Sequence, residues 1–156
     1  MLTIRRAQQE DCDSIARVHS AAVTGIRTTM YTAEELQSWG TPKKAESYQE
    51  SIRTKEFFVA DDDGVVMGFA ILKPENGEVE AVYVSPKAGR RGVGLALLRK
   101  LDERARAHSL SVIHLYSSLN AVPFYKRAGY VAQEQSKYRL STGVEIACVP
   151  MTKTIT

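Results

Sequence analysis

The spacing of hydrophobic residues along the chain predicts a mixture of short strands and amphipathic helices. Ile15, Val18, Ala22 and Ile26 recur at helical spacing, which predicts a first helix from about residue 11. Thr32 and Glu35 form a capping-box pattern that predicts the start of a second helix, ending near Trp39. The polar stretch 43–54 predicts a third. A longer helix is expected over 92–108, with one apolar face, and a short one over 120–128. The face of the longer helix is made of Leu95, Leu98, Leu101 and Ala105.

Alternating or continuous apolar runs between these helices predict the strands. Aspartate- and glycine-containing turns at 61–64 and 74–77 separate them into antiparallel neighbours. The expected strands are residues 2–6, 57–60, 65–72, 78–84 and 112–116, followed by a closing hairpin of 130–140 and 144–151.

This order of elements predicts an α+β fold. We expect a mixed, mostly antiparallel central sheet of about seven strands, flanked by helices, in a single domain over residues 1–156. The strands before and after the long helix are joined by a crossover and should therefore run parallel.

Composition and charge restrict the possible functions. The chain has 156 residues, a hydrophobic content of 44% and a formal net charge of +3. That charge is too small to favour nucleic-acid binding, which needs a broad basic face. We expect a cytoplasmic protein without a membrane segment, a signal peptide or a disulfide between Cys12 and Cys148. The histidines His19, His108 and His114 and the two cysteines have no metal-ligand spacing, so no metal is expected.

The stretch from Val84 to Leu95 carries the clearest functional signal. A strand ends at Pro86, and a basic loop containing Gly89, Gly92 and Gly94 leads into the long helix. Unpaired backbone N–H groups at a helix N-terminus, together with the helix dipole, suit a pyrophosphate or a similar anion. A P-loop would need Lys-Ser/Thr after the last glycine. A dinucleotide fingerprint built on Gly92 and Gly94 would need a glycine where this chain has Leu97, and an acidic residue at the end of the next strand, which instead ends in Tyr116-Ser117. Neither pattern is present.

A second motif follows about one strand later, in Asn120-Ala121-Val122-Pro123-Phe124-Tyr125-Lys126-Arg127-Ala128-Gly129-Tyr130. Together the two motifs resemble the GNAT superfamily of N-acetyltransferases, and the resemblance extends from Leu2 to Met151. It implies that the glycine loop binds the pyrophosphate of acetyl-coenzyme A. It also implies that Asn120 contacts this cosubstrate and that Tyr125 is catalytic. The family usually has Gln or Arg where this chain has Gly89.

The resemblance implies further contacts with acetyl-coenzyme A. The expected set consists of Val82, Tyr83, Val84, Gly89, Arg90, Arg91, Gly92, Val93, Gly94, Asn120 and Tyr125. Backbone N–H groups near Val82 to Val84 would polarise the thioester carbonyl, where the family separates two parallel strands. Arg90 or Arg91 would supply the charge that Gly89 does not. Asn120 could equally be a helix N-cap.

The chemistry of acetyl transfer to an amine requires a base and an acid. An unperturbed lysine-type amine has a pKa of ~10.4 and must lose a proton before it attacks. Glu80 is the candidate base, Glu78 is its competitor on the same strand face, and either could simply be a solvated carboxylate. Tyr125 could protonate the leaving thiolate, or could be a core residue. No serine or cysteine lies beside a plausible base, so direct attack in a ternary complex is expected.

The acceptor is expected to be a small-molecule or peptide primary amine. Tyr31 and Trp39 frame the variable region that shapes the acceptor site in the family, and His19 could face it. The competing function is a non-catalytic acyl-coenzyme A sensor or interaction module. A homodimer is compatible with the resemblance.

Overall fold

The computed structural model describes all residues 1–156 and contains one eight-stranded sheet with helices on both faces. The strands are β1 (Leu2–Arg6), β2 (Glu56–Asp62), β3 (Val65–Lys73), β4 (Glu78–Val84), β5 (Val112–Ser117), β6 (Val131–Ala132), β7 (Ser136–Arg139) and β8 (Glu145–Thr154). The α-helices are α1 (Cys12–Thr24), α2 (Ala33–Trp39), α3 (Ala45–Thr54), α4 (Val93–Ala107) and α5 (Val122–Arg127). Single 3₁₀ turns, η1 (Gln9–Asp11), η2 (Pro86–Ala88) and η3 (Leu119–Ala121), precede α1, the glycine loop and α5.

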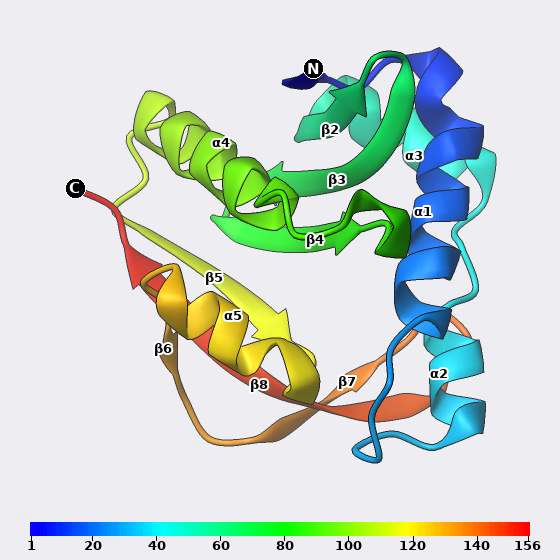
Figure 1. The fold of residues 1–156 in the computed structure, drawn as a ribbon. Helices are drawn as coiled ribbons and strands as arrows, with labels where there is room; N and C mark the ends of the chain where they lie inside the picture. Colours follow the sequence, from blue (N-terminus) through cyan, green and yellow to red (C-terminus); the bar gives the residue numbers. More distant parts are fainter.

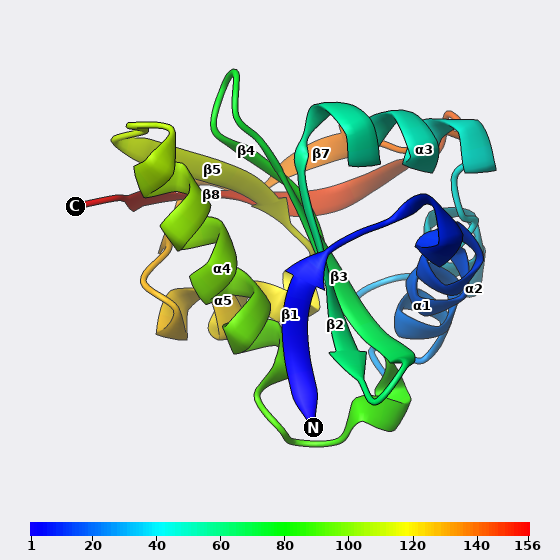
Figure 2. The same cartoon turned by 90° about the horizontal axis from the view of Figure 1, so that it is seen from above.

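The strands follow the order β1-β2-β3-β4-β5-β8-β6, and β7 also pairs with β8. Every pairing is antiparallel except that of β4 with β5, as the crossover predicted. Helices α4 and α5 cover one face of the sheet, and α1, α2 and α3 lie on the other (Figure 1, Figure 2). The predicted fold class is therefore confirmed.

Each face of the sheet has its own hydrophobic core. The larger core packs α4 against the sheet, and its helical contribution is Val93, Leu97, Leu98, Leu101 and Ala105. Leu98, Leu101 and Ala105 are buried as predicted, but Leu95 is 38% exposed. Leu95 lies at the edge of the helical stripe because Gly94 and Leu101 occupy its centre. The smaller core lies under α1 and α3.

The predicted start of the second helix and the predicted closing hairpin differ in outcome. The capping box that starts α2 is confirmed: the Glu35 N–H donates to Thr32 Oγ1, and the Thr32 N–H donates to Glu35 Oε1. The predicted closing hairpin is confirmed around its turn, where β7 pairs with β8. Its first strand is not continuous over 130–140, because this segment forms the two separate strands β6 and β7. Both pair with β8, β6 near its C-terminal end and β7 near its N-terminal end, so the chain crosses between them without a ladder.

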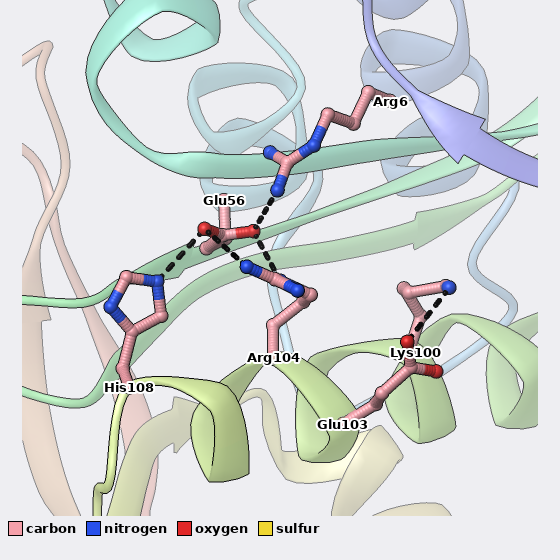
Figure 3. Close-up of polar contacts among 6 residues, drawn as sticks. All are labelled: Arg6, Glu56, Lys100, Glu103, Arg104 and His108. Carbon is pink, nitrogen blue, oxygen red and sulfur yellow. Dashed lines mark hydrogen bonds and ion pairs between the residues drawn. The ribbon is translucent and has the colours of Figure 1, made fainter.

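A buried carboxylate fastens α4 to the edge of the sheet. Glu56 Oε1 accepts from Arg6 and from Arg104 Nε at 2.9 and 2.8 Å, and Oε2 lies 2.9 Å from His108 Nε2 (Figure 3). Burial raises the pKa of Glu56, but the contacts with His108, Arg104 and Arg6 outweigh it, so the pKa lies below its ordinary value. His108 therefore helps to hold α4 on the sheet through its contact with Glu56.

We predict that Glu56→Gln destabilises the fold by about 1–3 kcal/mol at neutral pH, because the negative charge behind three contacts is lost and an NH₂ donor replaces one of the two acceptor oxygens. Since the folded-state pKa of Glu56 is depressed, its stabilisation is complete above the unfolded pKa of about 4.3 and disappears as pH falls through the folded pKa. The difference between variant and wild type should therefore shrink in acid. Urea unfolding at several pH values measures this.

The matched control is Glu103→Gln, because Glu103 forms an exposed ion pair with Lys100 on the same helix (Figure 3). We expect it to change stability by less than about 0.5 kcal/mol. Equal effects of the two substitutions would contradict the anchoring role of Glu56.

Candidate active site

The central feature of the site is the divergence of β4 from β5. The two strands share one paired position, Glu78 with His114, and separate beyond it (Figure 1). The Ser85 N–H donates to Met67 on the β3 side, so by strand alternation Val82 and Val84 direct their N–H groups to the β5 side. β5 is not there to accept them. The strand therefore presents main-chain donors to an open slot.

A β-bulge in β4 changes which side chains share a face. Ile71 pairs with Ala81 and Leu72 pairs with Val79, so Glu80 is the extra residue. In a regular strand Glu80 and Tyr83 would point to opposite faces. With the bulge, both line the same cavity on the α1 side of the sheet.

The glycine loop between η2 and α4 has the properties of an anion site. Gly89 and Gly92 adopt φ values of 68° and 70°, and a Cβ added at either would meet nothing within 4 Å. The main-chain N–H groups of residues 89–95 donate no hydrogen bond within the protein. These donors lie at the N-terminus of a 15-residue helix, where the helix dipole also favours negative charge.

The basic side chains of the loop differ in their contacts. The Arg91 guanidinium is engaged within the protein, because it donates to Ala88 O at 2.9 Å and to Asp62 Oδ2 at 2.8 Å. Arg90 and Lys87 are exposed and make no ion pair or hydrogen bond through their side chains. A Cβ on Gly94 would lie 3.0 Å from the Phe124 ring, so this glycine allows α4 and α5 to pack closely.

Two cavities meet at the divergence of β4 and β5. The smaller, about 200 Å³, lies between β4 and α5 and is lined by Val82, Tyr83, Val84, Asn120 and Tyr125 among others. The larger, about 440 Å³, lies on the α1 side. They share the lining residues Trp39, Val79, Glu80, Ala81, Tyr83, Tyr116 and Ser118, which we call the junction.

Two tyrosine hydroxyls reach this region. Tyr125 is 9% exposed, its hydroxyl has no protein hydrogen-bond partner, and it is not among the fully buried unpaired atoms, so the hydroxyl faces the smaller cavity. Burial, followed by the influence of Tyr83, raises the pKa of Tyr125 well above its ordinary value. Burial likewise raises the pKa of Tyr83 to about 12. Both phenols are protonated at neutral pH.

Glu80 is held by a lysine that the sequence did not indicate. Lys55 Nζ lies 2.7 and 3.0 Å from the two carboxylate oxygens. The ion pair fixes the orientation of Glu80 at the junction, where Glu80 lines both cavities. Glu78 lines the larger cavity and does not line the smaller one. Both glutamates share a strand face, as expected.

A hydrogen-bonded aromatic cluster forms one wall of the larger cavity. His19 Nε2 donates to Trp39 O at 2.8 Å, which leaves Nδ1 to accept from the Tyr48 hydroxyl at 3.4 Å. Burial is the main cause of a lowered His19 pKa, so the ring is neutral at neutral pH. It stacks on Tyr83 at 4.6 Å, and Trp39 Nε1 donates to the Tyr83 hydroxyl at 2.9 Å. The helical spacing of Tyr48 and Ile52 was the signal that could have revealed Tyr48.

The remaining predicted residues are placed as follows. Tyr31 lines neither cavity; its hydroxyl donates to Ala147 O and accepts from the Leu119 N–H, which ties the α1–α2 loop to β8 and η3. Asn120 is exposed on the lining of the smaller cavity. Its alternative reading as a helix N-cap is wrong, because Ser118 and Ala121 hold the N-cap positions of η3 and α5.

Several other features bear on the chemistry of the chain. Cys12 and Cys148 are free and buried, as expected, and burial raises the pKa of both thiols. No group of three or more His, Cys, Asp or Glu side chains is arranged to hold a metal ion. None of the helices combines the length and hydrophobicity needed to cross a lipid bilayer.

Comparison with known proteins agrees with this geometry. The family model of the GNAT acetyltransferase domain matches residues 27–155. The chain is 33% identical over 126 residues to the uncharacterised N-acetyltransferase YuaI of Bacillus subtilis, covering 74% of this chain and 71% of the relative. It is 26% identical over 150 residues to the uncharacterised N-acetyltransferase MJ1207 of Methanocaldococcus jannaschii, and it spans only 63% of that protein's length.

Solved structures share the same fold. A GCN5-related N-acetyltransferase from Rhodopseudomonas palustris superposes with a TM-score of 0.84 at 26% identity, over 97% of this chain and 94% of the other. The PaiA N-acetyltransferase of Thermoplasma acidophilum, solved in complex with coenzyme A, gives 0.80 at 20% identity over 99% of each chain. The chain belongs to the GNAT family of acetyltransferases.

Proposed function

We propose that this protein transfers the acetyl group of acetyl-coenzyme A to a primary amine by direct attack in a ternary complex. The observation that carries the proposal is the continuity of three features. Unpaired N–H donors of residues 89–95 lie at the head of α4, where a Cβ on Gly94 would lie 3.6 Å from the Val84 side chain, and the slot beside Val82 and Val84 opens at Glu80 on a second cavity.

The donor side fits a pyrophosphate followed by a slender acyl arm. The loop N–H groups would bind the pyrophosphate, and Arg90 and Lys87 are the cations that remain available there. The unpaired N–H groups of Val82 and Val84 would bind the arm and the thioester carbonyl. Acetyl-coenzyme A supplies an activated acyl group when bound.

The two cavities together supply the base and the acid. Glu80, oriented by Lys55, takes the proton from the acceptor ammonium directly or through water. The neutral amine nitrogen then forms a bond to the acyl carbon, and the carbon–sulfur bond breaks. The Tyr125 hydroxyl, protonated because its pKa is raised, donates its proton to the departing sulfur. The protonated amide nitrogen then gives a proton through solvent to the Tyr125 phenolate, and Glu80 releases its proton to solvent, which restores the enzyme.

Direct attack is favoured over an acyl-enzyme because the site offers no activated nucleophile. Cys148 lines the larger cavity, but burial raises its pKa and it does not line the smaller cavity or the junction. The amine therefore must reach the acyl carbon itself.

Release of coenzyme A from acetyl-coenzyme A in the presence of an amine panel tests the proposal. We expect amine-dependent release of free thiol and a matching acetylated product by mass spectrometry. Binding of acetyl-coenzyme A without turnover of any amine would contradict the proposed function and would favour a non-catalytic binding protein.

We predict that Tyr125→Phe lowers kcat by about 10²–10³ while the Kd for acetyl-coenzyme A changes less than about threefold, because only the proton donor is lost. Single-turnover kinetics and calorimetry measure the two quantities. Tyr83→Phe is the matched control, since its hydroxyl also lies at the junction; we expect less than about a tenfold loss of kcat. A larger loss for Tyr83→Phe would transfer the acid role to that residue.

We predict that Glu80→Gln lowers kcat/KM by about 10²-fold or more at pH 7.5, because the amine then keeps its proton. The deficit should diminish as pH rises toward the amine pKa of about 10.4, where the free amine exists in solution. Glu78→Gln should cost less than about tenfold and leave the pH profile unchanged. A pH-independent deficit for Glu80→Gln would show that Glu80 is not the base.

A further inference from the structure

The larger cavity is electrostatically divided, and this division bears on which amine it accepts. Glu78 and Glu80 belong to β4 and line the larger cavity from that strand. After burial, their negative charges are among the causes that raise the pKa of the Tyr138 hydroxyl. Lys43 lines the same cavity from the loop between α2 and α3. Glu80 is already paired with Lys55, whereas the Lys43 ammonium makes no ion pair or hydrogen bond within the protein.

Lys43 is held close to the cavity wall by its own main chain. Its N–H donates to the Tyr48 hydroxyl at 3.3 Å, and that hydroxyl is hydrogen-bonded to His19. The Lys43 charge, after burial, contributes to lowering the His19 pKa, which places the ammonium near the neutral ring. The neighbouring lining residues Ser38, Thr41 and Ser141 are all hydroxyl-bearing. This end of the cavity therefore offers a cation and hydroxyl groups.

Arg139 of β7 is a second cation in the cavity lining. Its neighbour Tyr138 pairs with Ile146, and both of these also line the cavity. Because neighbouring side chains of a strand point to opposite faces, β7 directs Tyr138 into the cavity more squarely than Arg139. Lys43 is the lining cation whose charge acts on His19, so we assign the anion to Lys43.

A contact between two surface segments limits the size of the ligand. The Ser38 hydroxyl of α2 is hydrogen-bonded to the Thr142 hydroxyl in the turn between β7 and β8. Ser38 lines the larger cavity, and so does Ser141 beside Thr142, so the contact joins two segments of the cavity lining. A compact ligand fits a cavity whose lining segments are joined in this way better than a polypeptide lying across it.

From these observations we propose that the acceptor is a small primary amine that carries an anionic group, a carboxylate or a phosphate, and that Lys43 binds this group. The inference rests on the proposed acetyl transfer and names its substrate class. The amine would lie at the junction beside Glu80, and the anion would lie toward Lys43, away from both glutamates. A charge-assisted hydrogen bond of this kind is worth about tenfold to a hundredfold in binding.

Matched acceptor pairs test the proposal. Each pair joins an amine that carries an anionic group to the corresponding amine without that group: L-phenylalanine and phenethylamine, 5-aminovalerate and pentylamine, phosphoethanolamine and ethanolamine. We expect kcat/KM to be at least about tenfold higher for the anionic member of at least one pair. The pairs that show the preference distinguish a carboxylate from a phosphate.

Variants of Lys43 assign the preference to that residue. Lys43→Gln should lower kcat/KM for the anionic amine about tenfold, mainly through KM, and should change the neutral amine less than about threefold. Lys43→Glu should shift the preference toward a diamine such as cadaverine over pentylamine. Lys44→Gln, at the adjacent exposed lysine outside the cavity lining, should change neither.

The outcomes that overturn the inference are distinct from those that overturn the proposed function. Equal use of both members of every pair, an equal effect of Lys43→Gln on both members, or a clear preference for a lysine within a peptide would overturn the inference alone. Turnover of no amine would overturn the proposed function and this inference with it.

Discussion

The separation of β4 from β5 is the constraint on which the site depends. A continuous ladder between these strands would satisfy the N–H groups of Val82 and Val84 and close the passage between the two cavities. Instead the strands share one paired position and then diverge, and the rest of the sheet holds that arrangement. The donors on β4 are close to the free donors at the head of α4, since a Cβ on Gly94 would lie 3.6 Å from the Val84 side chain.

Elements on both sides of the sheet keep this opening in place. On one side, Glu56 fastens α4 to β2, and Gly94 lets α4 pack closely against Phe124 of α5. On the other, Tyr31 ties the α1–α2 loop to β8 and η3. The hydrogen bonds of His19 and Trp39 then fix the face of Tyr83 at the junction. The polar groups that define the site are thus held by contacts outside it.

Local sequence patterns predicted much of this arrangement. The Val84–Leu95 pattern located the glycine loop at the head of α4, the Thr32–Glu35 capping box located α2, and the crossover gave the parallel pair. These features depend on neighbouring residues, so one segment of sequence is enough to reveal them. The placement of Glu78 and Glu80 on one face likewise followed from strand alternation.

The features that escaped prediction depend on residues far apart in the chain. The bulge at Glu80 is a property of its pairing with β3, and the ion pair with Lys55 joins residues that share no local motif. The break between β6 and β7 reflects where each segment meets β8. For the same reason the contact of Ser38 with Thr142, which joins two segments of the larger cavity's lining, has no counterpart in the sequence pattern.

Titration of ¹⁵N-labelled protein with acetyl-coenzyme A tests the central claim most directly, because it observes the main-chain donors themselves. The account predicts saturable binding with the largest amide shifts at residues 89–95 and at Val82 and Val84, and slower hydrogen exchange at those amides in the complex. Absence of binding at millimolar acetyl-coenzyme A, or binding that leaves these amides unchanged, would contradict it.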